Sequence, residues 1–260
     1  MKIGITQIIL GNISVNDTIE LCKNAGYEAV ELTLRDGTDC HPELSEDKFQ
    51  TIARNFSSAN IEISSLAGLK GNLLSLDDDE RQSARESLVS SIEIAGIMKV
   101  GAILVHPGQL AVEGTYQQVW NNLVADLKDL VYLARSKNVA ISLENVWNKF
   151  LLSPKEMREI IDEISSPWVG AYLDTANMMA YGYPEHWIRE LGSRIKRVHF
   201  KDFNRREHRF VNLLDGDTNW SIVMEELRRI GYQDPVIHEV DGDIPTQIDI
   251  AKRMRQIVEM

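Results

Sequence analysis

The sequence predicts a single (β/α)₈ barrel that occupies residues 1–260 as one domain. Three observations predict it. Eight runs rich in Val, Ile and Leu alternate with stretches of helical period, each strand–helix unit takes about 32 residues, and no Pro/Gly/Ser-rich linker divides the chain. A doubly wound open sheet is the main alternative, but its G-x-G-x-x-G fingerprint is absent.

The predicted strands are continuous apolar runs, which is typical of parallel strands covered by helices on their outer face. They span Ile3–Ile9, Ala29–Leu34, Ile61–Leu66, Ala102–His106, Ala140–Glu144, Val169–Asp174, Arg197–Phe200 and Val236–Val240. Because strand and helix alternate throughout, we expect each strand to lie parallel to the next.

The predicted helices carry start signals. The clearest helical period runs from Val119 to Ala134. Ser14 and Ser45 are placed to cap the first and second helices, and the acidic run 77–80 complements the N-terminal dipole of the third. Ser153 followed by proline predicts the start of the fifth helix.

The chain is acidic and poor in cysteine. It holds 28 Lys and Arg against 39 Asp and Glu, a net charge of −11, which argues against a general nucleic-acid binder. Cys22 and Cys40 have no C-x-x-C spacing and indicate reduced thiols of a cytoplasmic protein. Residues 1–7 lack the features of a signal peptide, and no apolar run is long enough for a membrane span.

Polar residues end four successive predicted strands: Glu144, Asp174, His199 and Glu239. Functional side chains of such barrels lie at the carboxyl ends of the strands, so these four are expected at equivalent heights around the mouth. Three carboxylates would repel one another there without a cation. Together with an imidazole they form a ligand set that suits Mn²⁺, Mg²⁺ or Co²⁺, and the set contains no thiolate of the kind structural zinc sites use.

The order and spacing of four stretches carry a family resemblance. These are Leu143-Glu144-Asn145, Leu173-Asp174-Thr175, His199-Phe200-Lys201-Asp202 and Gly231-Tyr232 followed by His238-Glu239. With them, nearly the whole chain resembles the xylose isomerase-like TIM-barrel superfamily of sugar and sugar-phosphate isomerases and epimerases. It is most similar to the ketose 3-epimerase branch.

The resemblance implies roles for the four strand-end residues. Glu144, Asp174, His199 and Glu239 match metal ligands, with Mn²⁺ as the first choice of cation and Mg²⁺, Co²⁺ or Zn²⁺ as alternatives. Glu144 and Glu239 also match the acid/base pair on opposite faces of the substrate. The implied partner is a small sugar or sugar phosphate, with no nucleic acid and no membrane, and relatives of this kind commonly form homo-oligomers.

Substrate contacts are expected from three further residues. The resemblance implies that Arg205 binds substrate hydroxyls, and Asn177 stands where the family usually has histidine. His106 ends the fourth strand and is a candidate for a substrate hydrogen bond. Glu31 ends the second strand and is interpreted as structural, and Trp147 as packing a loop or shielding a sugar.

A basic run follows the seventh strand in this acidic chain: Arg205, Arg206, His208 and Arg209. Barrel enzymes often bind phosphate near this position, and Arg suits bidentate phosphate contacts. A solvated loop balanced by neighbouring carboxylates explains the run equally well.

Alternatives stay open at this point. The same scaffold hosts aldose–ketose isomerases and dehydratases of keto-polyols or keto-acids, and fold alone does not choose among them. A non-catalytic carbohydrate-binding barrel is the contrasting class. The DNA-repair endonucleases of the superfamily are disfavoured because they need a His-rich cluster of three metals, and the six histidines here are scattered.

Overall fold

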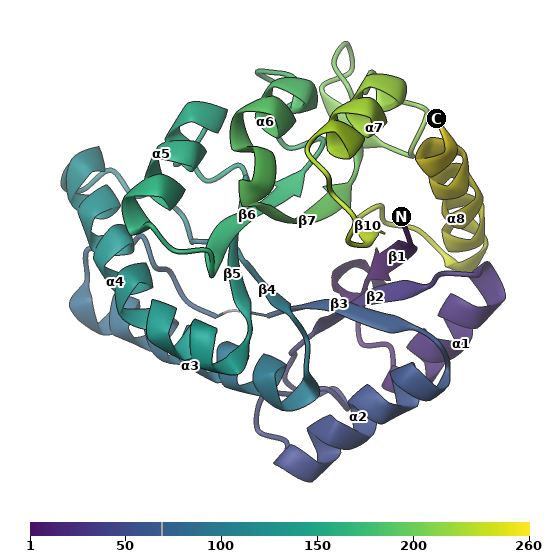
Figure 1. The fold of residues 1–260 in the computed structure, drawn as a ribbon, viewed down its shortest axis with the longest axis horizontal. Helices are drawn as coiled ribbons and strands as arrows, with labels where there is room; N and C mark the ends of the chain where they lie inside the picture. The colour runs from purple at the N-terminus through teal and green to yellow at the C-terminus, as the bar shows by residue number, and fades with distance from the viewer. Residues whose placement is uncertain (69) are drawn as a thin grey trace.

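Eight parallel strands close into a barrel in the computed structural model, which describes residues 1–68 and 70–260 (Figure 1). The strands are β1 (Ile3–Thr6), β2 (Ala29–Thr33), β3 (Glu62–Ala67), β4 (Ala102–Val105), β5 (Ala140–Glu144), β6 (Val169–Asp174), β7 (Ile195–Phe200) and β10 (Val236–His238). Around the barrel the order is β1-β10-β7-β6-β5-β4-β3-β2, so each barrel strand lies beside the next one along the chain, and the last, β10, closes the barrel against β1. The predicted (β/α)₈ barrel is confirmed.

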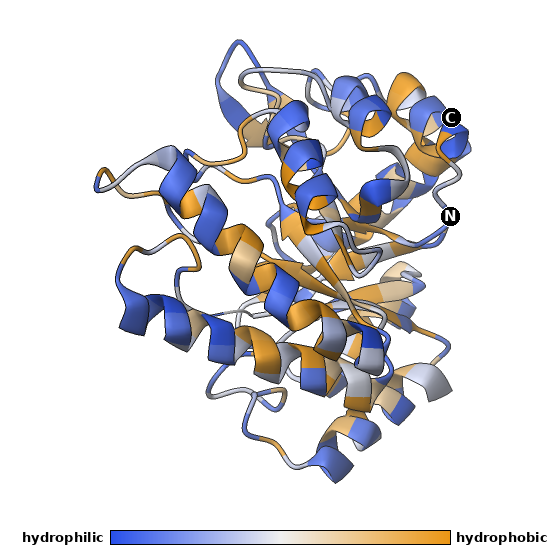
Figure 2. Cartoon of the chain, turned by 60° about the vertical axis from the view of Figure 1, so that its left-hand side comes forward, coloured by the Kyte–Doolittle hydropathy of each residue, from blue (hydrophilic) through white to orange (hydrophobic). Residues whose placement is uncertain are grey.

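Among the described residues, eight α-helices form the outer ring of the barrel (Figure 1). They are α1 (Val15–Ala25), α2 (Glu46–Ser58), α3 (Asp78–Met98), α4 (Tyr116–Lys137), α5 (Pro154–Ile164), α6 (Pro184–Leu191), α7 (Trp220–Arg229) and α8 (Ile244–Glu259). Figure 2 shows both hydropathy classes on the same helices and a predominantly hydrophobic sheet. None of the helices described is long and apolar enough to cross a membrane.

The predicted helix starts agree with the structure, with one difference in detail. Ser14 and Ser153 each accept a hydrogen bond from a backbone N–H of the first turn, and Ser153 forms a full capping box with Glu156. Asp77 caps α3 in the same way. Ser45 occupies the N-cap position of α2 but makes no capping hydrogen bond through its side chain.

Several strand boundaries differ from the prediction by one to three residues, and those at the ends of β1 and β10 lie at the mouth of the barrel. β1 ends at Thr6, because the Thr6 hydroxyl accepts the Ile8 N–H and starts a 3₁₀ turn, η1 (Gln7–Leu10). β10 ends at His238, so Glu239 lies one residue beyond it. β7 begins at Ile195, two residues before the predicted start.

The sequence analysis did not predict the antiparallel hairpin that follows β7. It consists of β8 (Asp202–Asn204) and β9 (Arg209–Val211), with Phe203 opposite Phe210. Its turn contains neither glycine nor proline, and His208 itself adopts a left-handed φ of 51°. The usual turn signals are therefore missing from the sequence.

Close approach of neighbouring strands leaves no room for a side chain at Gly4 in β1. A Cβ there would lie 2.5 Å from Ile237 Cδ1 and 2.6 Å from the Ala29 carbonyl oxygen. The second contact is to backbone, which cannot move aside without disturbing the β1–β2 pairing. The glycine therefore sets how tightly the barrel closes at this strand.

We predict that Gly4→Ala destabilises the protein by about 1–3 kcal/mol, since overpacking forces strands apart. Chemical denaturation measures the free energy of unfolding. The control is Gly101→Ala, where the nearest atom to a new Cβ is Arg197 Nη2 at 3.5 Å and the change should be small. Equal stability of the two variants would contradict the strand-contact explanation.

Candidate active site

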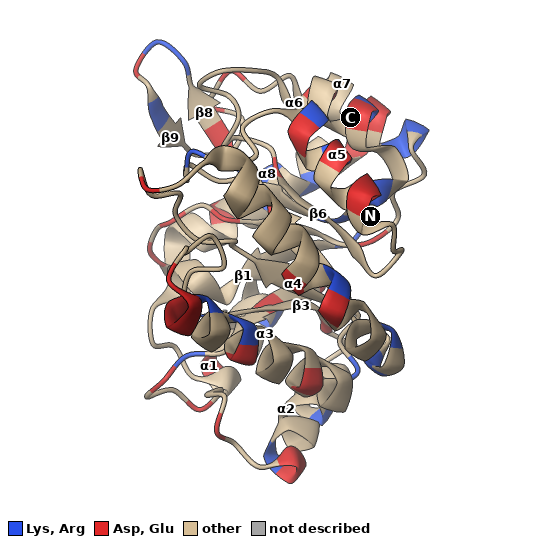
Figure 3. Ribbon diagram, turned by 90° about the vertical axis from the view of Figure 1, so that its left-hand side faces the viewer, with Lys and Arg blue, Asp and Glu red and all other residues tan. Residues whose placement is uncertain are grey.

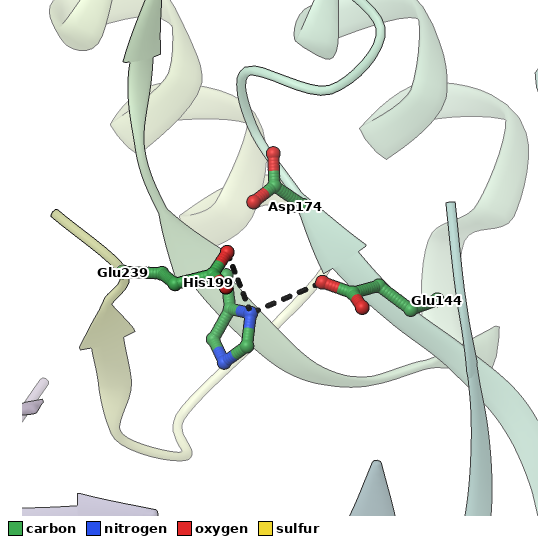
Figure 4. A group of neighbouring side chains, drawn as sticks. All are labelled: Glu144, Asp174, His199 and Glu239. Atoms are coloured by element: carbon green, nitrogen blue, oxygen red, sulfur yellow. Dashed lines mark hydrogen bonds and ion pairs between the residues drawn. The ribbon is translucent and has the colours of Figure 1, made fainter. Parts of the chain in front are cut away.

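Four side chains meet at the carboxyl ends of the strands: Glu144 of β5, Asp174 of β6, His199 of β7 and Glu239 after β10 (Figure 4). Each offers one ligand atom, and these atoms all lie within 4.8 Å of one another. Glu144, Asp174 and His199 are buried, whereas Glu239 is half-buried. The structure thus brings together the four residues that the sequence analysis selected.

The four residues do not share one height, contrary to expectation. Asp174 pairs with His199 across β6 and β7, but Glu144 pairs with Tyr172, two residues before Asp174. Strands of a closed barrel are tilted and staggered, which accounts for the offset. The side chains start from different levels of the barrel, but they extend toward the same space in its mouth (Figure 4).

His199 lies between two carboxylates. Its Nδ1 is 3.2 Å from Glu144 Oε1 and its Nε2 is 3.0 Å from Glu31 Oε1. Glu31 is fully buried and also accepts hydrogen bonds from the hydroxyls of Thr6 and Ser65, both at 2.8 Å. An Nε2–H donated to Glu31 leaves the Nδ1 lone pair facing the cluster, the arrangement that carboxylate–histidine–metal triads use.

Sequence reasoning treated Glu31 as structural and missed this contact with His199. One signal was available: Thr6, Glu31 and Ser65 are polar residues within otherwise apolar strands, and β-sheet pairing places Glu31 level with both of the others. Reading the three strands side by side would have identified a polar layer inside the barrel.

Asp174 carries the observation that bears most directly on a metal. Its Oδ1 accepts the N–H groups of Ala176 at 2.8 Å and Asn177 at 2.6 Å. Its Oδ2 is buried and has no hydrogen-bond partner among the described residues. A buried carboxylate oxygen without a partner is costly, and a cation would satisfy it. The donor set, with its oxygen atoms and one imidazole nitrogen, therefore fits a divalent metal ion.

Burial and mutual repulsion distort the acid–base properties of the cluster. Burial raises the pKa of Glu144 to about 7, against the opposing effect of His199. Burial also raises the pKa of Asp174, although Lys201 opposes it. Burial alone would lower the pKa of His199, but Glu31 and Glu144 raise it well above its usual value. Without a cation the cluster therefore retains protons that a metal would displace.

Lys201 is the second residue of the site that sequence reasoning left without a role. It belongs to the His199–Asp202 motif, and its Nζ lies 2.8 Å from Glu239 Oε2. Burial would lower the pKa of Lys201, but Asp174 and Glu239 raise it, so the side chain is an ammonium. A half-buried cation thus lies beside the half-buried member of the cluster.

The three expected substrate-binding residues lie in different surroundings. Asn177 adjoins the cluster: its backbone N–H donates to Asp174, and its side chain donates to the Asn145 carbonyl at 2.9 Å. His106, one residue beyond the end of β4, is half-buried, and burial lowers its pKa. Arg205 points elsewhere, since its guanidinium donates to the Gly182 carbonyl at 2.6 Å.

The basic run after β7 spans the turn of the β8–β9 hairpin and the first residue of β9, where Figure 3 shows basic and acidic residues together. Arg205 stacks its guanidinium over the Tyr183 ring at 4.4 Å. Arg209 pairs with Glu207, and the His208 ring stacks on Trp147 with centroids 6.0 Å apart. These contacts hold the hairpin, and phosphate recognition by the run stays a prediction.

Two cavities open at the mouth. A polar one of about 610 Å³ is lined by Lys201, Glu239 and Arg209 among others, and so reaches the cluster directly. An apolar one of about 450 Å³ includes Tyr181 and Trp187 in its wall. Trp147 also lines the apolar cavity; it donates to the Asn177 carbonyl at 2.6 Å and packs on Phe210 with ring centroids 5.2 Å apart.

One protein family matches almost the whole length of the chain. The family described as the xylose isomerase-like TIM barrel matches residues 19–259. The chain belongs to this family. The expectation from the sequence motifs is thereby confirmed.

Relatives within the family carry more than one activity in their names. An uncharacterized protein of Methanocaldococcus jannaschii is 24% identical over 100% of this chain and 90% of its own length. A putative L-ribulose-5-phosphate 3-epimerase, SgbU, of Haemophilus influenzae is 25% identical over 77% of this chain and 73% of its own. A probable endonuclease 4 of Mesomycoplasma hyopneumoniae is 26% identical over 64% of this chain and 63% of its own.

Solved structures share the fold at low identity. A D-tagatose 3-epimerase-like protein superposes with a TM-score of 0.84 at 23% identity, covering 100% of this chain and 97% of its own. The IolI protein, whose structure is described with a zinc atom, superposes with a TM-score of 0.85 at 20% identity, covering 100% of this chain and 98% of its own. The probable 3-DHS dehydratase AsbF of Bacillus anthracis superposes with a TM-score of 0.78 at 20% identity, covering 98% of this chain and 98% of its own.

We predict that metal binding is strongly pH dependent. The raised pKa of Glu144, about 7, means that its contribution to stability in the metal-free protein is fully present at low pH and is lost as pH rises through about 7. Mn²⁺ binds the ionised carboxylate, so in its presence ionisation of Glu144 no longer destabilises the folded protein. Differential scanning fluorimetry should show a larger Mn²⁺-induced rise in Tm near pH 8 than near pH 5.5. Each kcal/mol added to the free energy of unfolding raises Tm by about 2–4 °C in a protein of this size.

Glu144→Gln serves as the control for this measurement, since it removes the titrating group. Its Mn²⁺-induced shift in Tm should be small at both pH values. A wild-type shift that is equal at the two pH values would contradict the assignment of Glu144 as a buried, proton-retaining member of the cluster.

We also predict that Glu31→Gln weakens Mn²⁺ binding by about 10- to 100-fold, the usual effect of losing a carboxylate behind a ligating histidine. Isothermal titration calorimetry measures the Kd. Ser65→Ala, which removes only one hydrogen bond to Glu31, should change the Kd much less. Unchanged affinity of Glu31→Gln would show that the Glu31 carboxylate does not orient His199.

Proposed function

We propose that this chain is a divalent-metal-dependent sugar isomerase or epimerase, and specifically a ketose 3-epimerase acting on a small ketose or ketose phosphate. The observation that carries the proposal is the position of two glutamates. Glu144 and Glu239 reach the cluster from opposite sides of His199 (Figure 4). Epimerisation requires proton removal on one face of a carbon and proton return on the other, and two opposed carboxylates suit this task.

The chemistry follows from this arrangement. When bound by the four ligands, Mn²⁺ would supply Lewis-acid stabilisation of negative charge on the substrate oxygens. Glu144 takes the C3 proton, and the electron pair of the C–H bond moves toward the neighbouring carbonyl, which leaves C3 planar. Glu239, which enters this step in its protonated form, donates its proton to the other face of C3 as the electron pair returns from the oxygen, so C3 regains four bonds with inverted configuration. Glu144 is left protonated and Glu239 ionised, and proton exchange with solvent restores both. The reverse reaction exchanges the roles of the two glutamates.

Mn²⁺ is our proposed cation, with Mg²⁺, Co²⁺ and Zn²⁺ as alternatives. Three carboxylates and one imidazole accept any of these ions, so the donor set limits the choice without fixing it. The zinc atom in the description of the IolI structure supports including zinc in metal tests. The SgbU name likewise supports including ketose 5-phosphates in the substrate panel.

A dehydratase of a keto-polyol or keto-acid is the second candidate. Such a reaction also begins with proton abstraction beside a carbonyl, so the same cluster suits it, and AsbF shares the fold. A multi-metal nuclease is less well supported, because the cluster contains a single histidine.

The decisive variants are Glu144→Gln and Glu239→Gln, assayed with Mn²⁺ against a panel of ketoses and ketose phosphates. Each should lower kcat by about 10²–10⁴-fold, because each removes one proton-transfer group. Glu159→Gln, on the exposed side of α5, is the matched control and should keep wild-type turnover. Circular dichroism and Tm check that all three variants fold.

Isotope exchange separates the candidate reactions. In D₂O the epimerised product should carry deuterium at C3, because the returning proton comes from a carboxyl group that exchanges with solvent. Release of water without inversion would support the dehydratase. Wild-type turnover by either glutamine variant would refute the two-carboxylate mechanism.

A further inference from the structure

Lys201 occupies an unusual place for a lysine. Its side chain is 17% exposed and lies within the mouth of the barrel, two residues after His199. Lysine usually keeps its ammonium in water and buries only its aliphatic stem. Here the ammonium points at Glu239 Oε2 from 2.8 Å, so it is enclosed with the carboxylate cluster.

The two proposed acid/base glutamates are held by different partners. Glu144 Oε1 lies 3.2 Å from His199 Nδ1, within hydrogen-bond distance. Glu239 Oε2 lies 3.9 Å from the same nitrogen, too far for a hydrogen bond. The Glu239 backbone N–H donates to the Phe200 carbonyl at 3.1 Å, which fixes the main chain but leaves the side chain free to turn. Lys201 supplies the hydrogen bond that directs this side chain.

Lys201 is in turn held from the hairpin side. Its Nζ lies 4.4 Å from the centroid of the Phe210 ring, a cation–π contact. Phe210 packs against Trp147 and opposite Phe203, so the ring itself has a fixed position. The ammonium therefore has two defined contacts, the ring of β9 and the carboxylate of Glu239.

We propose that Lys201 is a positioning residue for Glu239 and a resident cation that competes with the metal for this carboxylate. This inference rests on the proposed function, since Glu239 has a proton to deliver only if the site is an epimerase or a related enzyme. Lys201 binds Oε2, the oxygen that also lies 3.9 Å from His199 Nδ1, and so holds the carboxylate against the cluster. Its positive charge also repels a divalent ion in the same cluster, which weakens metal binding.

The two effects have opposite signs, and this makes the test specific. Lys201→Met keeps the apolar stem and removes the charge. Its kcat should fall by about tenfold or more with KM changed less than about threefold, because misplacing a reacting group affects turnover more than binding. Its Kd for Mn²⁺, measured by calorimetry without substrate, should become about threefold tighter or more as the repulsion is removed.

Two further variants complete the design. Lys201→Arg keeps the charge and should retain the wild-type Kd for Mn²⁺ together with most of the turnover. Lys155→Met, at a lysine that is 70% exposed on α5, is the control and should match the wild type in both measurements. If Lys201→Met does not fold, Phe210→Leu, which removes the ring face above the ammonium but keeps its charge, should lower kcat by a smaller amount and leave the Kd for Mn²⁺ near the wild-type value; wild-type kcat in this variant would contradict the positioning role.

Each outcome decides the proposal. Lower kcat together with tighter Mn²⁺ binding supports the proposal. Structural damage to the site would instead lower kcat and weaken Mn²⁺ binding. Wild-type kcat, or Mn²⁺ binding that weakens in parallel with kcat, overturns it. If the wild-type protein turns over no ketose, the proposed function fails separately, and unchanged or weaker Mn²⁺ binding by Lys201→Met then overturns the metal-competition role.

Discussion

The mouth of this barrel is organised by the need to balance buried negative charge. Glu31, Glu144 and Asp174 are buried around a single imidazole, and Glu239 adjoins them. Carboxylates this close are strongly destabilising unless cations, protons or hydrogen-bond donors compensate them. Burial raises the pKa of Glu144, and Glu31 and Glu144 raise the pKa of His199, so protons as well as a cation can offset the negative charge. Asp174 Oδ2, which has no hydrogen-bond partner in the part of the chain that the structure describes, marks the position at which compensation is incomplete.

Irregular strand pairing helps to aim these groups. The register between β2 and β3 shifts between Val30 and Glu31, and that between β6 and β7 shifts between Ala171 and Tyr172. Bulges of this kind redirect the side chains that follow them, and they are common beside active sites. The extra residue is Ser64 of β3 in the first case and Lys196 of β7 in the second, so Ser65 and His199 lie after the irregularities on their own strands. The irregular strands thus carry the two side chains that meet Glu31, the Ser65 hydroxyl and the His199 imidazole.

Sequence patterns predicted the parts of the structure that depend on local order along the chain. The eight strands, the caps at Ser14 and Ser153, and the strand-end positions of Glu144 and Asp174 follow from apolar runs and their polar ends. Glu31 and Lys201 could not be assigned in this way, because their roles come from contacts with His199 and Glu239 across the barrel. The hairpin after β7 was missed for a local reason, since its turn carries no glycine or proline.

The two sides of the cluster differ in what holds them. Glu144 is linked through His199 to Glu31 and to the hydroxyls of Thr6 and Ser65, all within the strands of the barrel. Glu239 is linked through Lys201 to the hairpin, which is part of a surface connection. Barrel strands form the rigid core, whereas connecting loops open at lower free-energy cost. One face of the site is therefore fixed by the barrel, and the geometry of the opposite face depends on the seating of the hairpin.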